Sequence, residues 1–279
     1  MRKWYQHPFI PDTITGNWLH TLGVFASISF LLVVLLEGTF AIPSAGANSV
    51  IVADSFNRTV SNGWGIANSG GPWTVLDTPA NWSVSPGMGS ISVVADAQDR
   101  GVLGSVAVQD VDLLAKIVLP RCNGSGTNCD TYLIGRYSGG STPSYYRVGA
   151  IQGQGNSTVL LRAQRSDGIY LSTDLDTGIP AANGVALWIR VEFQGVNPTT
   201  IRARIWQNGT TEPSTWLLDT TDNTSAEQVA GAVGVRVRNE DTAASHTFQY
   251  ESYQVTSLSS STPTPTPTLT STPTTPTPT

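Results

Sequence analysis

The acidic side chains of this 279-residue chain are the first place to look for chemistry. Hydrolysis of a glycosidic bond uses two carboxyl groups about 5–10 Å apart, which a strand supplies from alternate positions on one face. Glu192 is alone on its predicted strand, Glu240 and Asp241 fall in a predicted turn, and Asp174 and Asp176 have the spacing but precede a Thr-Gly turn. We therefore assign no catalytic residue, and a polysaccharide hydrolase or lyase with an untypical site stays an alternative.

The sequence also contains few residues suited to a nucleophilic hydrolase or to a lyase. A serine nucleophile needs a histidine base, and His246 is the only histidine after residue 47, with no Gly-x-Ser-x-Gly motif in the chain. A lyase needs a tyrosine or histidine base beside a cation, which Tyr145, Tyr146 and Arg147 could supply together with His246. These patterns favour a protein that is not an enzyme and leave enzymatic activity undecided.

Arginine and tryptophan alternate with apolar residues in the segment 186–206. Its predicted hairpin turns Leu187, Ile189, Val191 and Phe193 to one side and Trp188, Arg190 and Glu192 to the other. Further arginines lie at comparable positions of other predicted strands. If neighbouring strands pair, one face carries the predicted ligand-binding residues, which are Trp188, Arg190, Glu192, Arg202, Arg204, Trp206, Arg147, Arg162 and Arg236, with Arg238 alongside.

Such a face suits a saccharide. Tryptophan offers a flat apolar surface to a sugar ring, and arginine donates hydrogen bonds to hydroxyls or pairs with carboxylates and sulfates. The sequence thus predicts binding of a polysaccharide or surface glycan, including an acidic one. The alternative is that these arginines lie over tryptophan rings and pair with Glu192, Glu251 and Asp112, stiffening a structural or adhesive domain that contacts another protein.

The two cysteines predict a disulfide. Cys122 and Cys129 enclose a short polar loop, and in an oxidising compartment such a pair forms a disulfide by default. Zinc is disfavoured because no second cysteine pair exists. Calcium remains open: Asp54 and the acidic turns at 219–222 and 240–241 offer oxygen ligands, whereas acids in turns commonly cap backbone N–H groups instead. No other cofactor is indicated.

The elements that position these residues are strands. Period-two alternation broken by Gly, Pro and Asn recurs along the chain, with no persuasive amphipathic helix. Trp64 and Trp73, on a Gly-rich stretch, are interpreted as a plug for the open edge of a sandwich. The pattern favours an all-β protein, a two-sheet antiparallel sandwich or jelly roll. The expected strands are 49–53, 82–84, 91–94, two within 101–120, 131–137, 145–151, 158–164, the hairpin at 186–206, 215–218, 231–238 and 247–255.

Several segments, in order and spacing, resemble the concanavalin A-like (LamG-type) jelly-roll domains of exported bacterial surface proteins and carbohydrate-active enzymes. They are Asp54-Ser-Phe-Asn-Arg-Thr59, Gly63-Trp-Gly65, Gly71-Pro-Trp-Thr-Val75, the stretch from Trp206 through Gly209-Thr-Thr-Glu-Pro213 to Trp216, Gly231-Ala-Val-Gly-Val235 and the strand from Phe248 to Tyr253. The resemblance implies two antiparallel sheets, one of them concave, with glycans bound on that face or its rim and a structural calcium ion in some members. Because such domains differ in function, it implies a scaffold before an activity.

The chain divides into three predicted parts. Residues 1–47 combine Arg2 and Lys3 with an apolar run and Ala45-Gly-Ala47, as in a signal peptide or a membrane anchor that engages the export machinery or the membrane. Residues 48–258 form the sandwich. Residues 259–279 are a Ser/Thr/Pro stalk that cannot bury a core and is expected to be disordered. Such a linker separates a domain either from a cell wall or from a further module.

Composition supports this export. Of the 15 basic residues 13 are arginine, a bias unusual for cytosolic surfaces. The formal net charge of −5 argues against nucleic acid as a partner. We therefore expect a secreted or cell-surface protein.

Overall fold

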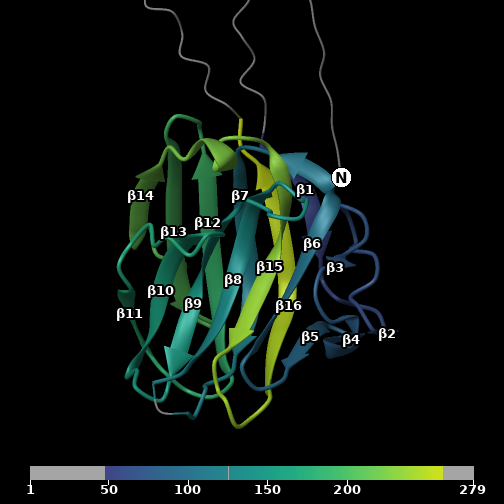
Figure 1. The fold of residues 1–279 in the computed structure, drawn as a ribbon, viewed down its shortest axis with the longest axis vertical. Helices are drawn as coiled ribbons and strands as arrows, with labels where there is room; N and C mark the ends of the chain where they lie inside the picture. Colours follow the sequence, from purple (N-terminus) through teal and green to yellow (C-terminus); the bar gives the residue numbers. More distant parts are fainter. Residues whose placement is uncertain (1–47, 125, 260–279) are drawn as a thin grey trace, which may run out of the picture. The chain divides into compact units, whose positions relative to one another are not determined.

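The computed structural model describes residues 48–124 and 126–259. Within them sixteen strands form two antiparallel sheets, as the alternation predicts, together with two 3-10 turns, Pro79–Asn81 and Ser225–Glu227 (Figure 1). In these residues no helix reaches the length and apolar character that crossing a bilayer would require. The predicted export helix and the Ser/Thr/Pro tail lie outside the described residues, apart from Ser259.

The first sheet has nine strands. Their order is β14-β13-β12-β7-β16-β5-β4-β2, and β1 pairs with β16. The bounds are β1 Ser49–Asp54, β2 Val60–Ser61, β4 Trp82–Ser85, β5 Met88–Val93, β7 Val111–Leu119, β12 Val185–Gln194, β13 Thr199–Gln207, β14 Leu218–Asp222 and β16 His246–Ser257.

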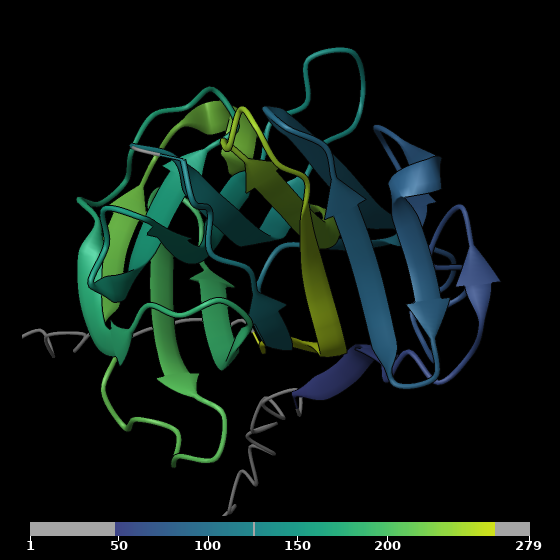
Figure 2. The same ribbon diagram turned by 90° about the horizontal axis from the view of Figure 1, so that it is seen from below.

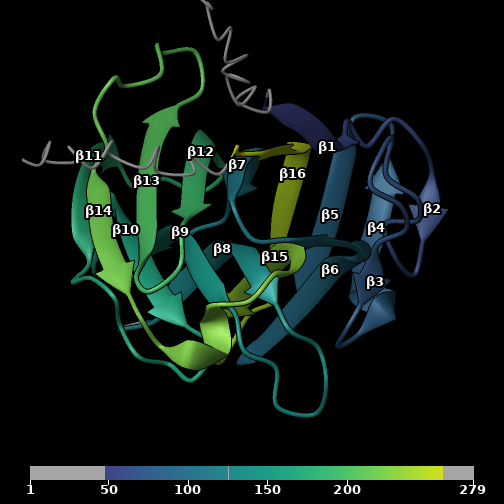
Figure 3. The same cartoon turned by 90° about the horizontal axis from the view of Figure 1, so that it is seen from above.

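The second sheet has seven strands in the order β11-β10-β9-β8-β15-β6-β3. The bounds are β3 Thr74–Val75, β6 Ala97–Val108, β8 Asn128–Tyr137, β9 Tyr146–Gly153, β10 Thr158–Arg165, β11 Leu175–Pro180 and β15 Gly231–Asn239. Seen from above, β8, β9 and β15 lie in one layer and β12, β13 and β16 in the other (Figure 3), and Figure 2 shows the two layers from the opposite end.

Apolar side chains from both layers form one core. The hairpin of β12 and β13 buries Leu187, Val191 and Phe193 completely, as predicted, and pairs Trp188 with Trp206 and Arg190 with Arg204 across the ladder. The two sheets differ on their outer faces. Outward side chains of β7 and β12 are half-buried, whereas those of β8 and β9 are almost all buried. The outer side chains of the seven-stranded sheet therefore cover one another.

Tryptophans close one edge of the sandwich, as the Gly-rich loop predicts. Trp64 is fully buried and meets four other aromatic rings edge-on: Phe56, Trp73, Trp82 and Tyr250, with ring centroids 4.5–5.2 Å from its own. Its indole nitrogen donates to the carbonyl oxygen of Ser90 at 3.1 Å. Edge-to-face contacts suit the quadrupoles of these rings, so the loop is bound into the core.

The structure differs from the predicted strands at β14 and β11 and agrees with the predicted disulfide. The strand predicted at 215–218 is wrong except at its last residue, because β14 runs from Leu218 to Asp222 and pairs its polar Thr220 and Thr221 with β13. Strand β11 was not predicted, since Thr177-Gly178 was interpreted as a turn. The predicted disulfide between Cys122 and Cys129 is confirmed.

Candidate functional site

The predicted ligand-binding residues divide between the two sheets. Trp188, Arg190 and Glu192 project from β12, and Arg202, Arg204 and Trp206 lie on β13, both in the nine-stranded sheet. Arg147, Arg162 and Arg236 project from β9, β10 and β15 of the seven-stranded sheet. The expectation that they all share one face is therefore wrong. The chain crosses from one sheet to the other after β11 and again after β14. The alternation of side chains within a strand does not indicate which sheet the strand joins, so these crossings could not be predicted.

On the nine-stranded sheet the arginines are paired with acids. Arg190 binds Asp112 and, through Nε, Glu212 at 2.7 Å. Arg204 binds Glu212 at 2.6 Å, and Arg202 meets Asp219 at 3.2 Å. This matches the predicted alternative in which paired arginines stiffen the sheet. Of the partners named there, Asp112 does bind Arg190, whereas Glu251 pairs with Lys116.

An aromatic ring and a half-buried acid complete this face. The Arg204 guanidinium lies 4.2 Å from the centroid of the Trp216 ring, a cation–π contact. Glu192 stands opposite Asp112 in the ladder, and burial together with that neighbouring carboxylate raises its pKa. Burial also raises the pKa of Asp112, against the attraction of Arg190. The charges of this face are thus largely engaged with one another.

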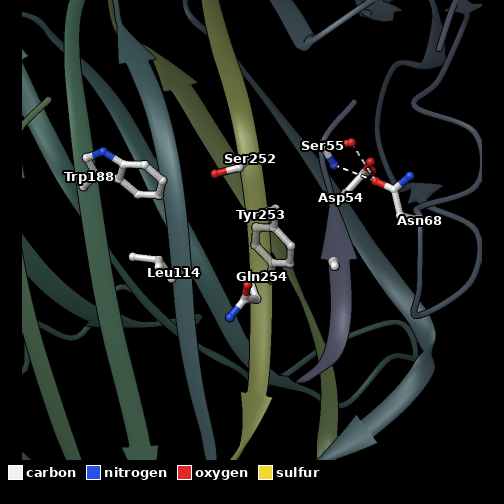
Figure 4. Close-up of a pocket in the computed structure, with 9 residues that line it drawn as sticks. Asp54, Ser55, Asn68, Leu114, Trp188, Ser252, Tyr253 and Gln254 are labelled. Carbon is white, nitrogen blue, oxygen red and sulfur yellow. Dashed lines mark hydrogen bonds between the residues drawn. The ribbon is translucent and has the colours of Figure 1, made fainter. Parts of the chain in front are cut away.

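A groove beside Trp188 lies between β12 and β1 of the same sheet. It measures about 230 Å³, and Figure 4 shows the Trp188 ring on one side, Ser252 and Gln254 on β16, and Ser55 with Asn68 on the far side. Trp188 is half-buried, its ring stacks on Trp206 at 6.2 Å with an interplanar angle of 11°, and its Nε1 donates to Asn208 at 3.3 Å. The indole is therefore held in one orientation at the edge of a hollow.

The outer face of the seven-stranded sheet centres on Tyr132, which is 1% exposed. Two guanidiniums lie over its ring, those of Arg147 at 5.4 Å and Arg236 at 5.5 Å from the centroid. Its hydroxyl donates to Asp130 at 3.1 Å, and Arg162 approaches the same carboxylate at 3.7 Å. Asp130 and Tyr132 were not predicted as site residues, although their alternation with Ile134 places them on one face of the strand.

Asp130 is a buried acid with an unusual pKa. One of its oxygens has no hydrogen-bond partner among the described residues, and burial, only partly offset by Arg162, raises its pKa to about 6. An unfolded aspartate releases its proton near pH ~4. Between these values the folded protein holds a proton that the unfolded chain has lost, so this group makes folding less favourable as pH rises.

We expect Asp130→Asn to remove this dependence. The free energy of unfolding of the wild-type protein, relative to that of the variant, should fall as pH rises from about 4 to above about 6. Urea unfolding at four pH values in this window measures it. Because the other titrating groups are common to both proteins, they cancel in the difference. Parallel curves for the two proteins would show that Asp130 is not protonated on folding.

Asp54, the predicted metal ligand, is already saturated. Its carboxylate accepts two hydrogen bonds from Arg58 at 2.7 and 2.8 Å, one from the Trp73 indole at 2.8 Å and one from the Phe56 backbone at 3.0 Å. A calcium ion would have to displace these donors. In the acidic turns, Asp222 accepts from Tyr146, Arg165 and Thr224, so this residue also serves the local structure.

The groups considered for other chemistry do not converge. Tyr146 points between the sheets and stacks on Phe193 at 5.5 Å, whereas Arg147 points outward, so the two do not form one lyase site. His246 meets Asp241 at 3.1 Å. The sulfurs of Cys122 and Cys129 lie near His246 but are bonded to each other, which removes the thiolates that a metal would need.

Comparisons with known proteins support the fold alone. No protein-family model and no curated protein sequence matches the chain. Among solved structures, a native glycosidic hydrolase is 11% identical, with 75% of this chain and 97% of that one covered at a TM-score of 0.50. The CBM2 module of the evolved Dit of Lactobacillus casei BL23 phage J-1 is 7% identical (76% and 96% covered, TM-score 0.49). A β-1,3-glucanase from Mycobacterium marinum is 11% identical (76% and 99%, TM-score 0.46). The likeness to the first of these shows a shared sandwich architecture.

Proposed function

We propose that residues 48–258 form a non-catalytic carbohydrate-binding module of an exported protein, of the concanavalin A-like, LamG-type kind, and that the groove beside Trp188 receives a sugar ring. The observation that carries the proposal is a half-buried indole, fixed in orientation, at the side of a hollow of about 230 Å³ rimmed by hydroxyl and amide groups. A preorganised aromatic surface binds without first losing side-chain entropy.

The polar groups of the groove match a sugar's hydroxyls. The side-chain oxygen of Asn68 accepts hydrogen bonds from both the backbone N–H and the hydroxyl of Ser55, at 2.7 and 3.0 Å. The amide nitrogen of Asn68 therefore lies on the side away from Ser55, where it can act as a donor. Ser252 and Gln254 stand on β16 between this amide and the indole (Figure 4). Hydroxyl and amide groups opposite a flat ring suit the polar edge and apolar face of a pyranose.

A non-catalytic role is supported by the acids of the groove. Among the residues lining it, Asp54 is the one carboxylate, and both its oxygens accept hydrogen bonds from protein donors. Glycosidic hydrolysis needs two free carboxyl groups facing the bond. The groove as built can hold a sugar but offers no acid–base pair to cleave it.

Export is supported by the disulfide, since such bonds persist in oxidising compartments. In this proposal residues 1–47 direct or anchor the chain and residues 259–279 space the module from its neighbour. The competing role is a structural or adhesive domain that contacts another protein. It is favoured by the paired arginines of the nine-stranded face, where Arg190, Arg204 and Glu212 form a continuous ion-pair network.

Trp188→Ala should abolish most glycan binding. Removing an aromatic anchor from an interface commonly costs about 2 kcal/mol or more, an affinity loss of roughly 30-fold. A glycan array identifies a ligand, and titration calorimetry then measures the loss. Trp216→Ala is the matched control, because Trp216 is also half-buried and lies against Arg204 but does not line the groove. Equal affinities of the wild-type and Trp188→Ala proteins would remove the groove from the proposal.

A further inference from the structure

A row of polar residues crosses the seven-stranded sheet at right angles to its strands. In the ladder, Arg236 of β15 stands opposite Arg100 of β6 on one side and Tyr132 of β8 on the other. Tyr132 is opposite Gly149 of β9, which is opposite Arg162 of β10. Arg147 lies one step along from this row and reaches over the same tyrosine ring. Four arginines thus gather on one outer face.

Their charges are not equally compensated. Arg100 binds Asp77 through two hydrogen bonds, at 2.9 and 2.8 Å, and Arg162 binds Asp174 through two, at 2.6 and 2.7 Å. Arg147 and Arg236 instead donate to neutral amide oxygens. Arg147 meets Gln164 at 3.1 Å and Arg236 meets Gln98 at 2.7 Å. Within residues 48–124 and 126–259 neither forms a salt bridge, in contrast to Arg190, Arg202 and Arg204 on the opposite sheet.

The two guanidiniums without an acidic partner contact the same ring and are poorly hydrated. Both residues are only 9% exposed and share the Tyr132 ring as a support. Burial lowers the pKa of Arg236, and the positive charge of Arg147 lowers it further. An anion bound by both guanidiniums would relieve that repulsion, and the exclusion of water would strengthen each charge-assisted hydrogen bond. Asp130 lies at the hydroxyl end of the tyrosine, beside Arg162, and attracts Arg236 from beyond salt-bridge distance.

Two hollows lie beside these arginines. One of about 590 Å³ is lined by residues 170–174, and Tyr170 there is 56% exposed with the Arg162 guanidinium 5.1 Å from its ring centroid. A second, of about 300 Å³, is lined by Val102, Tyr137, Ser138 and their neighbours. Because β10 and β6 lie on opposite sides of β9, β8 and β15, the two hollows lie on opposite sides of the arginine pair in the order of the strands, the second of them further along β15.

We propose that Arg147 and Arg236 bind a carboxylate or sulfate group of an acidic saccharide above the ring of Tyr132, with Tyr170 as a platform for an adjoining sugar. The binding of an anion is inferred from the two arginines that have no acidic partner. The inference that this anionic group belongs to a saccharide rests on the proposed function. The site is separate from the Trp188 groove, which lies on the outer face of the other sheet. The net charge of −5 makes an extended nucleic acid a poor ligand for so local a positive region.

Spectra of the arginine Nε–H groups, recorded on protein labelled with ¹⁵N, test the proposal. Glucuronate and glucose 6-sulfate are the anionic probes, glucose is the neutral control, and acetate and inorganic sulfate are the controls without a sugar. We expect at least one anionic sugar to shift the signals of Arg147 and Arg236 while leaving that of Arg202 in place, and to bind more tightly than the corresponding free anion. Glucose should leave all three signals unchanged. The two anionic sugars tell a carboxylate site from a sulfate site.

Variants assign the signals and measure the effect. Arg147→Gln and Arg236→Gln should each weaken binding about tenfold or more, as expected for the loss of a charge-assisted hydrogen bond. Arg202→Gln is the matched control, because Arg202 and its exposed partner Asp219 both lie on the other sheet. Should a variant fail to fold, the wild-type titration still decides.

Two results would overturn the proposal. No selective shift with either anionic sugar would remove the anion site, and equal affinity for the sugars and the free anions would remove the saccharide. Trp188→Ala should leave these shifts intact, because Trp188 lies on the other sheet. A failure of the Trp188 groove to bind glycans and a failure of this site are therefore separately visible.

Discussion

Arg136→Met is expected to lower the free energy of unfolding by about 3–5 kcal/mol, the range found when one partner is removed from a buried polar network. The Arg136 side chain is fully buried. Its guanidinium donates to the carbonyl oxygens of Gln109 at 2.9 Å, Gly195 at 2.7 Å and Glu227 at 3.2 Å, and to the Thr199 hydroxyl at 2.6 Å. Methionine fills much of the volume but removes all four hydrogen bonds, and the Gly195 carbonyl keeps only a longer bond from the Thr199 hydroxyl, at 3.3 Å, among the described side chains.

The measurement is urea unfolding followed by tryptophan fluorescence, with an unchanged slope against urea as the sign that only stability has changed. Arg202→Met is the matched control. Its ion pair with Asp219 is exposed, 38% and 55% for the two side chains, and such pairs contribute about 0–1 kcal/mol. Equal losses in the two variants would contradict a special role for Arg136.

Trp64→Ala should destabilise the protein by a similar amount, roughly 3–5 kcal/mol. The variant removes the ring against which Phe56, Trp73, Trp82 and Tyr250 pack and leaves the Ser90 carbonyl without its indole donor. Because Trp82 and Tyr250 are held by the ladders of β4 and β16, little collapse into the cavity is available.

Thermal unfolding monitored by near-ultraviolet circular dichroism reports directly on this cluster. Trp216→Ala provides the comparison, since a half-buried tryptophan in contact with one arginine should cost only about 0.5–1 kcal/mol. A midpoint for Trp64→Ala as high as that for Trp216→Ala would mean that the cluster fills space without holding the edge of the sandwich.

Side-chain alternation was enough to predict the sandwich and its central hairpin. In the segment 186–206, residues such as Leu187 and Phe193 had to face the core, and Trp188 and Trp206 were predicted on the opposite side of the hairpin. The disulfide and the buried tryptophans of the Gly-rich loop were likewise predictable. Each of these features depends on residues close in sequence or on composition.

The assembly of the candidate sites was not predictable in this way. Whether Arg147 joins Arg190 depends on which layer receives each strand, a property of the whole chain. Arg136 illustrates a second limit. Alternation would turn it outward with Ile134, but the ladder between β8 and β15 shifts register there, its φ of 58° is left-handed, and its side chain enters the end of the sandwich. The groove beside Trp188 depends on Ser55 and Asn68, far away in sequence.

The pairing of the first and last strands has a mechanical consequence. In β1 and β16, Ser49 stands opposite Ser257, so the chain enters and leaves the sandwich at the same end of one antiparallel pair. Tension between these two points would break the backbone hydrogen bonds between β1 and β16 one after another, beginning at Ser49 and ending at Asp54. If the domain links two anchored bodies, pulling would unzip its first strand at low force and expose Val52, turning the sandwich into an extensible joint well before its core gives way.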